Sequence, residues 1–249
     1  MKRIVTVAAA MLIALGGAVA QNSFKGVVKY NVESTGSVAV DLPDAARVAE
    51  IKVSGDDMYT KSPIFCSGMT EAVLVQGMTM TNCMNLSNLL GYLRSEGNEF
   101  TYEGSGKLLV KNTSKESDFD SLAIKDEEPG HFYYEYVDGE TMQIAGVTAR
   151  KLIRHQFDDE GKDHQMVMWY SSEIGPGLNL LFGGIKGMPL QCTVEVGEDR
   201  AITYTAVEIV KGKVKESDFL LPAGYETLGD EDLETLFGEI NDAIELMQD

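Results

Sequence analysis

The sequence predicts a mainly β protein, with antiparallel strands and an amphipathic helix near the C-terminal end. Three observations support this fold class. Apolar and polar residues alternate along several short stretches, turn-forming residues connect these stretches in pairs, and the segment 230–247 places its apolar residues at spacings of three and four. The length beyond the first twenty residues suits one large all-β domain or two small ones, and we predict a single domain over 21–249.

The first twenty residues have the composition of a secretory signal peptide. Lys2 and Arg3 precede the apolar run 4–15, and the small-residue site 18–20 predicts cleavage before Gln21. No cysteine follows the apolar run, so the lipobox of a lipid-anchored protein is missing. We therefore expect a soluble protein of the periplasm or the extracellular space. A retained membrane anchor is the weaker interpretation, because the run is shorter than the ~20 residues that span a bilayer.

The chain is acidic, with a formal charge of −18 that becomes −20 once Lys2 and Arg3 are removed. Nucleic acids and anionic membrane surfaces attract basic patches, so this charge argues against both as partners. Solubility is the simpler explanation of the acidity, and an acidic binding function is the less favoured one.

Alternating or apolar stretches predict four strands in the first half, at Phe24–Val32, Glu50–Tyr59, Glu71–Val75 and Lys107–Lys111. The stretch 86–93 is ambiguous between helix and strand, and the acidic run 113–129 is typical of a linker or a long surface loop. Met78, Met80 and Met84 surround Cys83. Because methionine fills irregular spaces, these residues form either an adaptable lining or ordinary core.

The second half contains one strand with a strong turn signal and two hairpins. The strand is 131–137, followed by the turn Asp138-Gly139. The hairpins pair 149–157 with 165–171, and 189–196 with 201–210.

The clearest helix runs over 230–247. Its apolar residues share one face, namely Leu233, Leu236, Phe237, Ile240, Ile244 and Met247. Asp230, Glu231 and Asp232 place negative charge where the helix dipole favours it. We expect the apolar stripe to pack on the sheet, although a partner-binding surface is a second interpretation.

One decapeptide recurs along the chain. VKNTSKESDF at 110–119 and VKGKVKESDF at 210–219 are offset by 100 residues without a gap. Two strands that end in similar loops explain this better than a duplicated half-domain, which stays open.

Three cysteines follow the predicted signal peptide, so one is left unpaired in an oxidising compartment. Cys66 and Cys83 lie in adjacent extended segments, and a disulfide between them would stabilise the fold by about 3 kcal/mol. Cys192 alternates with apolar neighbours and is interpreted as a buried small hydrophobe. A catalytic thiol remains open at that position.

The sequence lacks the motifs that would indicate an enzyme, a cofactor or a metal. It has no HExxH pattern, no GxSxG elbow and no complete phosphate loop. The acidic stretch FDDEGKDH at 157–164 lacks the EF-hand register and is best explained as a solvated turn. We therefore predict no catalytic residue, no cofactor and no metal, and a protein that is not an enzyme.

The stretch 169–192 is rich in both glycine and apolar residues, which is unusual for a connection. We predict that Leu178–Met188 forms a lid over an apolar cavity. Five residues are the candidate ligand contacts, namely Trp169, Tyr170, Leu180, Phe182 and Ile185. The alternative is a static loop that fills the core beside Cys192.

The second half resembles a known family. The runs IAGVTARKLI at 144–153, MVMWYSSEI at 166–174, GIKGMPLQC at 184–192 and ESDFLLPAGYE at 216–226 resemble a family of secreted Gram-negative envelope proteins of unknown function. That family is grouped with the lipoprotein-localisation proteins of the LolA and LolB type. The resemblance implies an open, curved antiparallel sheet, a half-barrel whose concave apolar face holds acyl chains in the carrier proteins.

Three function classes follow from these observations. An exported carrier that binds a lipid or another hydrophobic ligand leads, because of the glycine-rich apolar loop and the analogy of fold. A secreted structural or protein-interaction module is the alternative, and it should have a filled core with an exposed apolar patch. An unrecognised hydrolase is the third.

Overall fold

The computed structural model describes residues 24–66, 68–197 and 199–247, so the predicted signal peptide over 1–20 lies outside the described residues. Within them, eleven strands form one open antiparallel sheet in the order β6-β5-β4-β3-β2-β1-β11-β10-β9-β8-β7. The strands are β1 Lys25–Ser34, β2 Val48–Ser54, β3 Asp57–Thr60, β4 Thr70–Gln76, β5 Thr79–Asn85, β6 Lys107–Thr113, β7 Phe132–Ile144, β8 Val147–Phe157, β9 Asp163–Ser171, β10 Met188–Gly197 and β11 Arg200–Lys211. The helices are α1 Ser87–Ser95 and α2 Asp230–Leu246, with 3-10 turns η1 Asp44–Ala46, η2 Pro63–Phe65, η3 Glu116–Ala123, η4 Leu180–Phe182 and η5 Glu216–Phe219. The predicted mainly β, antiparallel fold class is confirmed.

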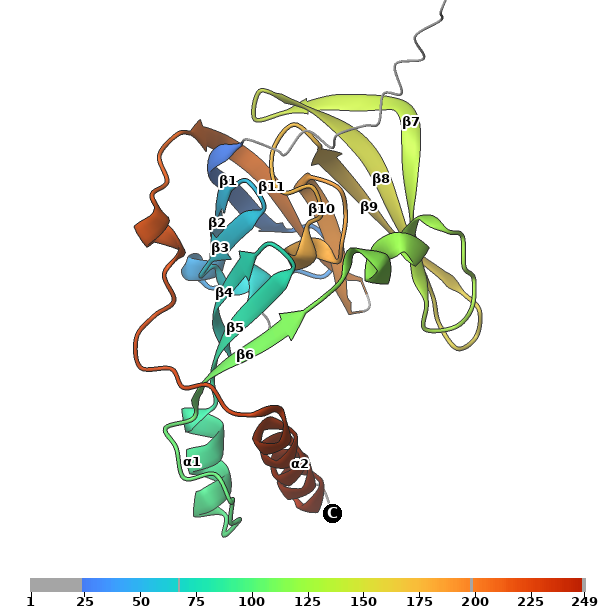
Figure 1. Cartoon of the computed structure of the whole chain (residues 1–249). Helices are drawn as coiled ribbons and strands as arrows, with labels where there is room; N and C mark the ends of the chain where they lie inside the picture. Colours follow the sequence, from blue (N-terminus) through green and yellow to red (C-terminus); the bar gives the residue numbers. More distant parts are fainter. Residues whose placement is uncertain (1–23, 67, 198, 248–249) are drawn as a thin grey trace, which may run out of the picture.

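The sheet consists of two meanders, β1–β6 and β7–β11, which are joined where β1 pairs with β11. It does not close, and its two edge strands are β6 and β7. Figure 1 shows the half that contains β7, β8 and β9 turned toward the half that contains β2–β6. The connection 114–131, which we call the strap, runs from one edge strand to the other and carries η3 (Figure 1).

The two faces of the sheet carry different apolar clusters. Alternation along β4 sends Val73 and Val75 to the main cluster on the concave face, and Ala72 and Leu74 to a smaller cluster on the outer face. The main cluster draws on both meanders, so it holds the two halves of the sheet together. Since apolar burial contributes roughly 25 cal/mol per Å², this face is the principal source of stability.

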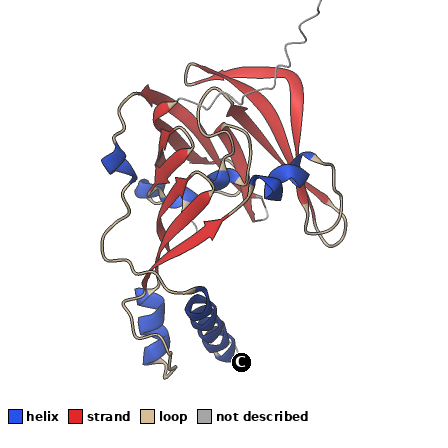
Figure 2. Ribbon diagram, in the orientation of Figure 1, coloured by secondary structure: helices blue, strands red, loops and turns tan. Residues whose placement is uncertain are grey.

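The C-terminal helix has the predicted extent, but its packing differs from the prediction. Its stripe packs on α1 and on Leu108 of β6, in a third cluster apart from the face of the sheet. Figure 2 shows the two helices side by side beyond the end of the strands. The ambiguous stretch 86–93 forms α1, which supplies Leu90 and Leu93 to this cluster and so offers α2 a partner helix. None of the helices in the described part of the chain is long and apolar enough to cross a membrane.

Two predicted strand boundaries were wrong. The stretch 50–59 is not one strand but a hairpin of β2 and β3, with Gly55 at a φ of +64° in the turn. Asp138-Gly139 does not end a strand either. The β7–β8 register shifts between Tyr136 and Thr141, so this dipeptide lies in a bulge and β7 continues to Ile144.

Candidate ligand-binding site

Residues 172–187, which we call the central loop, join β9 to β10. Asn179 organises this loop, and its side chain is fully buried. Its backbone N–H donates to the Ile185 carbonyl at 2.8 Å, its carbonyl accepts from the Gly184 N–H at 2.8 Å, and its side-chain amide donates to the Gly187 carbonyl at 2.9 Å. The central loop is therefore closed on itself by hydrogen bonds.

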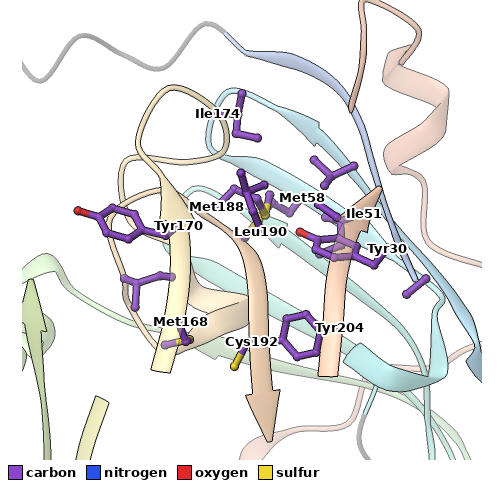
Figure 3. Close-up of a cluster of buried hydrophobic side chains, with 14 of the residues drawn as sticks. Tyr30, Ile51, Met58, Met168, Tyr170, Ile174, Met188, Leu190, Cys192 and Tyr204 are labelled. Carbon is purple, nitrogen blue, oxygen red and sulfur yellow. The ribbon is translucent and has the colours of Figure 1, made fainter. Parts of the chain in front are cut away.

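Three predicted ligand contacts, Leu180, Phe182 and Ile185, pack into the main cluster. Ile185 is fully buried, and the other two are half-buried. The ring of Phe182 lies 5.4 Å from that of Phe65 and 6.0 Å from that of Tyr204, between ring centroids. Figure 3 shows this buried cluster, in which Tyr30, Tyr204 and Leu190 come from three neighbouring strands.

Trp169 and Tyr170 are consecutive residues of β9 and leave the sheet on opposite faces. Tyr170 is buried on the concave face, with its ring centroid 5.5 Å from that of Tyr136. Trp169 is half-buried and pairs with Lys151 and Gln191 across the neighbouring strands. Both residues nevertheless belong to the main cluster, Tyr170 as a buried member and Trp169 as a half-buried residue packed against it.

A cavity of about 790 Å³ lies where the central loop, the strap, the first half of β7 and the β2–β3 and β4–β5 turns meet. Its apolar and aromatic lining consists of Met78, Phe119, Leu122, Tyr134, Tyr136 and Leu178. Four charged residues also line it, namely Asp56, Glu116, Asp120 and Lys186. The central loop contributes Leu178 and Lys186 to the wall, whereas Leu180, Phe182 and Ile185 are not among the lining residues.

The strap meets the central loop through one ring. Phe119 of η3 is half-buried and lies so close to Gly184 that a Cβ at this glycine would be 2.2 Å from the Phe119 Cδ1. Gly184 has a φ of +88°, a conformation that L side chains rarely adopt. The absence of a side chain at residue 184 is thus what lets the strap lie against the loop.

The recurring decapeptide forms the same local structure twice. In η3 the Asp118 carboxylate accepts from the Lys115 N–H at 2.7 Å, and in η5 Asp218 accepts from the Lys215 N–H at 2.7 Å. The phenylalanine that follows has a different environment in each copy. Phe219 is buried in the outer cluster, whereas Phe119 is half-buried at the cavity. Two strands ending in similar loops account for this similarity.

Two tyrosines of β7 connect the cavity wall to the central loop. The Tyr134 hydroxyl donates to the carbonyls of Phe182 at 3.1 Å and Gly183 at 3.2 Å. The Tyr136 hydroxyl accepts from the Lys186 N–H at 3.4 Å. Burial raises the pKa of Tyr134 to about 12, so its hydroxyl stays protonated at neutral pH and serves as a hydrogen-bond donor.

The three cysteines are buried free thiols in this structure, and the disulfide between Cys66 and Cys83 stays a prediction. Cys83 pairs with Ala72 in the outer cluster, whereas Cys66 follows η2 and joins the main cluster on the concave face. Cys192 is fully buried in the main cluster, and burial raises the pKa of its thiol to about 11. A protonated thiol is a poor nucleophile.

A cluster of titratable side chains surrounds His155 on the outer face. Its Nδ1 lies 2.8 Å from Asp163 and its Nε2 lies 3.1 Å from Glu135. The imidazole stacks on Tyr133 with ring centroids 4.6 Å apart. Both ring nitrogens are already used by carboxylates, so this cluster fixes the outer surface of β7, β8 and β9. The interpretation that the protein is not an enzyme stays a prediction.

The spacings between the histidines do not predict the one group of potential metal ligands that the described residues form. The structure brings Asp126, Glu128 and His131 close enough for their ligand atoms to lie within 4.8 Å of one another. Asp126 already accepts from the Glu128 N–H at 3.0 Å and lies 2.6 Å from His131 Nδ1. These contacts are typical of a turn that holds itself together.

Sequence reasoning missed most of the cavity lining, although one signal was present. Phe132, Tyr134 and Tyr136 alternate along the predicted strand 131–137, which places three rings on one face. Met78, noted as a possible adaptable lining, does line the cavity. Phe119 lies in the predicted linker, and nothing in its local sequence distinguishes it from Phe219.

No family model matches the sequence, and a search of curated proteins found no match. Solved structures similar to this chain include MucB in complex with MucA(peri), with a TM-score of 0.36 and 12% identity, covering 83% of this chain and 57% of that one. They also include the Pseudomonas aeruginosa MucA/MucB complex, with a TM-score of 0.38 and 12% identity, covering 84% and 60%. The chain thus spans less than two thirds of these two chains. A third is the LolA superfamily protein NE2245 from Nitrosomonas europaea, with a TM-score of 0.31 and 9% identity, covering 80% and 91%. A LolA superfamily protein is therefore among the similar structures.

Proposed function

We propose that this protein is an exported binding protein of the cell envelope that holds the hydrocarbon part of a lipid or another amphiphile in the cavity beneath the strap. The observation that carries the proposal is the cavity itself. Its volume of about 790 Å³ lies within the roughly 300–1,000 Å³ of ordinary ligand sites. Its wall combines apolar and aromatic side chains with four charged ones, and a mainly apolar lining with a small number of polar groups is the pattern of ligand sites.

The alternative is a structural or protein-interaction module, which should have a filled core. An unfilled hollow of this size on the concave face favours the binding function over that alternative. The predicted signal peptide supports a location in the envelope, and the acidic composition of the chain disfavours nucleic acid as a ligand.

The route into the cavity follows from how its covers are held. The central loop is closed by the hydrogen bonds of Asn179, whereas η3 of the strap is held by the packing of Phe119 at Gly184 and of Leu122 on the main cluster. The strap is therefore the cover that moves more easily. Leu180, Phe182 and Ile185 would touch a ligand only if the central loop also opened, as the lid prediction requires.

Binding of a fluorescent fatty acid tests the proposal, with a variant that fills the cavity. Leu178→Trp adds volume to the lining and should weaken binding at least roughly tenfold, since overpacking a filled site costs about 1–3 kcal/mol. Leu220→Trp is the matched control, because Leu220 is 69% exposed and lies away from the cavity. Wild-type protein that binds no hydrocarbon probe, or a folded Leu178→Trp variant that binds like wild type, would refute the proposal.

A further inference from the structure

Arg154 is a half-buried cation on the concave face. It lies on β8, where its register partners are Tyr134 of β7 and Met166 of β9. Its guanidinium lies over the ring of Phe132, 4.4 Å from the ring centroid. Among the described residues, neither a carboxylate nor any other acceptor is bonded to it. The chain has 39 acidic residues against 21 basic ones, so the missing carboxylate does not reflect a shortage of acids.

The sheet opens beside this arginine. Pairing between β9 and β10 ends at Met168 and Cys192, although β9 begins at Asp163 and β10 continues to Gly197. The two strands therefore diverge and leave a hollow of about 210 Å³. Besides Arg154, it is lined by Gln156, His164, Gln165, Met166, Thr193 and Glu195. A mostly polar hollow thus adjoins the guanidinium.

The hollow and the larger cavity have no lining residue in common, but they adjoin neighbouring strands, since the cavity is lined by Tyr134 and Tyr136 of β7 and the hollow by Arg154 and Gln156 of β8. Tyr134 lines the cavity and is the direct cross-strand partner of Arg154, and such partners have Cβ atoms about 4.5–5.5 Å apart. Arg154 also offsets part of the burial-driven rise in the pKa of both Tyr134 and Cys192. Its charge therefore acts on the same concave wall that the cavity uses.

We propose that Arg154 binds the head group of the cavity's ligand, and that this head group is the carboxylate or phosphate of a single-chain anionic amphiphile. The inference rests on the proposed binding function. A guanidinium stacked on an aromatic ring keeps its N–H edge free, and that edge matches a carboxylate or phosphate with two parallel hydrogen bonds. Thr193 and Gln165 also line the hollow but already have partners, since Gln165 Nε2 donates to Asp163 and Thr193 Oγ1 pairs with Thr203 Oγ1, both at 2.7 Å. Glu195 opposes an anion from the β10 side.

Calorimetric titration with four probes tests this assignment: dodecanoate, dodecyl phosphate, 1-dodecanol and inorganic phosphate. Wild-type protein should bind the two anionic amphiphiles at least about tenfold more tightly than the alcohol. Arg154→Gln should weaken their binding roughly 10- to 100-fold, as expected for losing charge-assisted hydrogen bonds, and leave the alcohol unchanged. Arg154→Lys should be intermediate, and Glu195→Gln should strengthen binding of the anions. Arg150→Gln is the matched control, because Arg150 is exposed on the same strand and face.

Each other outcome overturns a defined part of the reasoning. Equal binding of dodecanoate and dodecanol to wild type, or unchanged dodecanoate binding by Arg154→Gln, would refute the head-group site and leave the cavity function standing. If none of the amphiphiles binds, the proposed function itself fails. If inorganic phosphate alone binds as tightly as dodecyl phosphate and depends on Arg154, the site is for a free anion and the amphiphile is wrong. The comparison of dodecanoate with dodecanol on wild-type protein needs no variant. The inference can therefore be refuted even if the Arg154→Gln protein does not fold.

Discussion

Replacing Gly184 with alanine should detach the strap from the central loop. Two costs add at this position. A non-glycine residue at a φ of +88° is strained by about 1–2 kcal/mol. The new Cβ would also lie 2.2 Å from the Phe119 Cδ1, so the half-buried ring must leave its place. Since full burial of a phenylalanine is worth about 1.5–3 kcal/mol, that loss is about 1 kcal/mol. We expect the free energy of unfolding to fall by about 2–3 kcal/mol in total.

Urea unfolding measures the change, and Gly146→Ala is its control. Gly146 has a φ of +78°, but no atom lies within 4 Å of the place that an alanine Cβ would take, so only the backbone strain of about 1–2 kcal/mol applies. In the double variant with Phe119→Ala the clash is gone, so the two losses should fall short of additivity by about 1 kcal/mol. Equal destabilisation by Gly184→Ala and Gly146→Ala, or strict additivity, would show that Phe119 does not hold the strap.

Three further results are expected. Asn179→Ala should lower the free energy of unfolding by about 1–3 kcal/mol, because the Gly187 carbonyl loses its donor in a buried site; no loss in urea unfolding would mean that the loop does not need this bond. Asp126 raises the pKa of His131. This pair therefore stabilises the fold at a pH below the pKa of histidine in the unfolded chain, and the stabilisation is lost as the pH rises through the His131 pKa of the folded protein. An NMR titration should show a higher His131 pKa in wild type than in Asp126→Asn. Ile240→Ala should cost about 2–5 kcal/mol by leaving a gap between α1 and α2, while fatty-acid binding by the folded protein stays unchanged, and a change in binding would link the helices to the cavity.

Local pattern predicted the strands well where each strand has a buried and a solvated face. The pairs β8–β9 and β10–β11 were placed because alternation and polar turns agree there. The stretch 50–59 does contain a polar turn signal, Ser54-Gly55-Asp56-Asp57, and the prediction of a single strand passed over it. At Asp138-Gly139 the dipeptide forms a bulge and not a hairpin turn. A glycine at positive φ occurs in both structures, so the sequence signal does not distinguish them.

The candidate site was harder to predict than the strands. Tertiary packing decides which face of the sheet a loop covers, and local sequence does not show it. The central loop was identified as apolar and close to a cavity, yet its largest side chain, Phe182, packs on Phe65 and Tyr204. The residues that do line the cavity come from segments far apart in the sequence, around Met78, Phe119 and Tyr136. No single stretch contains that information.

An open curved sheet leaves its concave face to be covered by whatever else the chain provides. In this protein α2 does not provide the cover, because its apolar stripe packs on α1 beyond the end of β6. The concave face is covered instead by the central loop and the strap, neither of which contains an α-helix. A cover without a long buried stripe has little apolar area to lose on opening, so the free energy of displacing it is small compared with that of unfolding the sheet. The strap joins the two edge strands, β6 and β7, so its displacement would widen the mouth of the half-barrel without breaking any strand pair. Ligand exchange through the strap is therefore compatible with a rigid sheet, and hydrogen exchange should show faster opening in residues 114–131 than in β8 or β11.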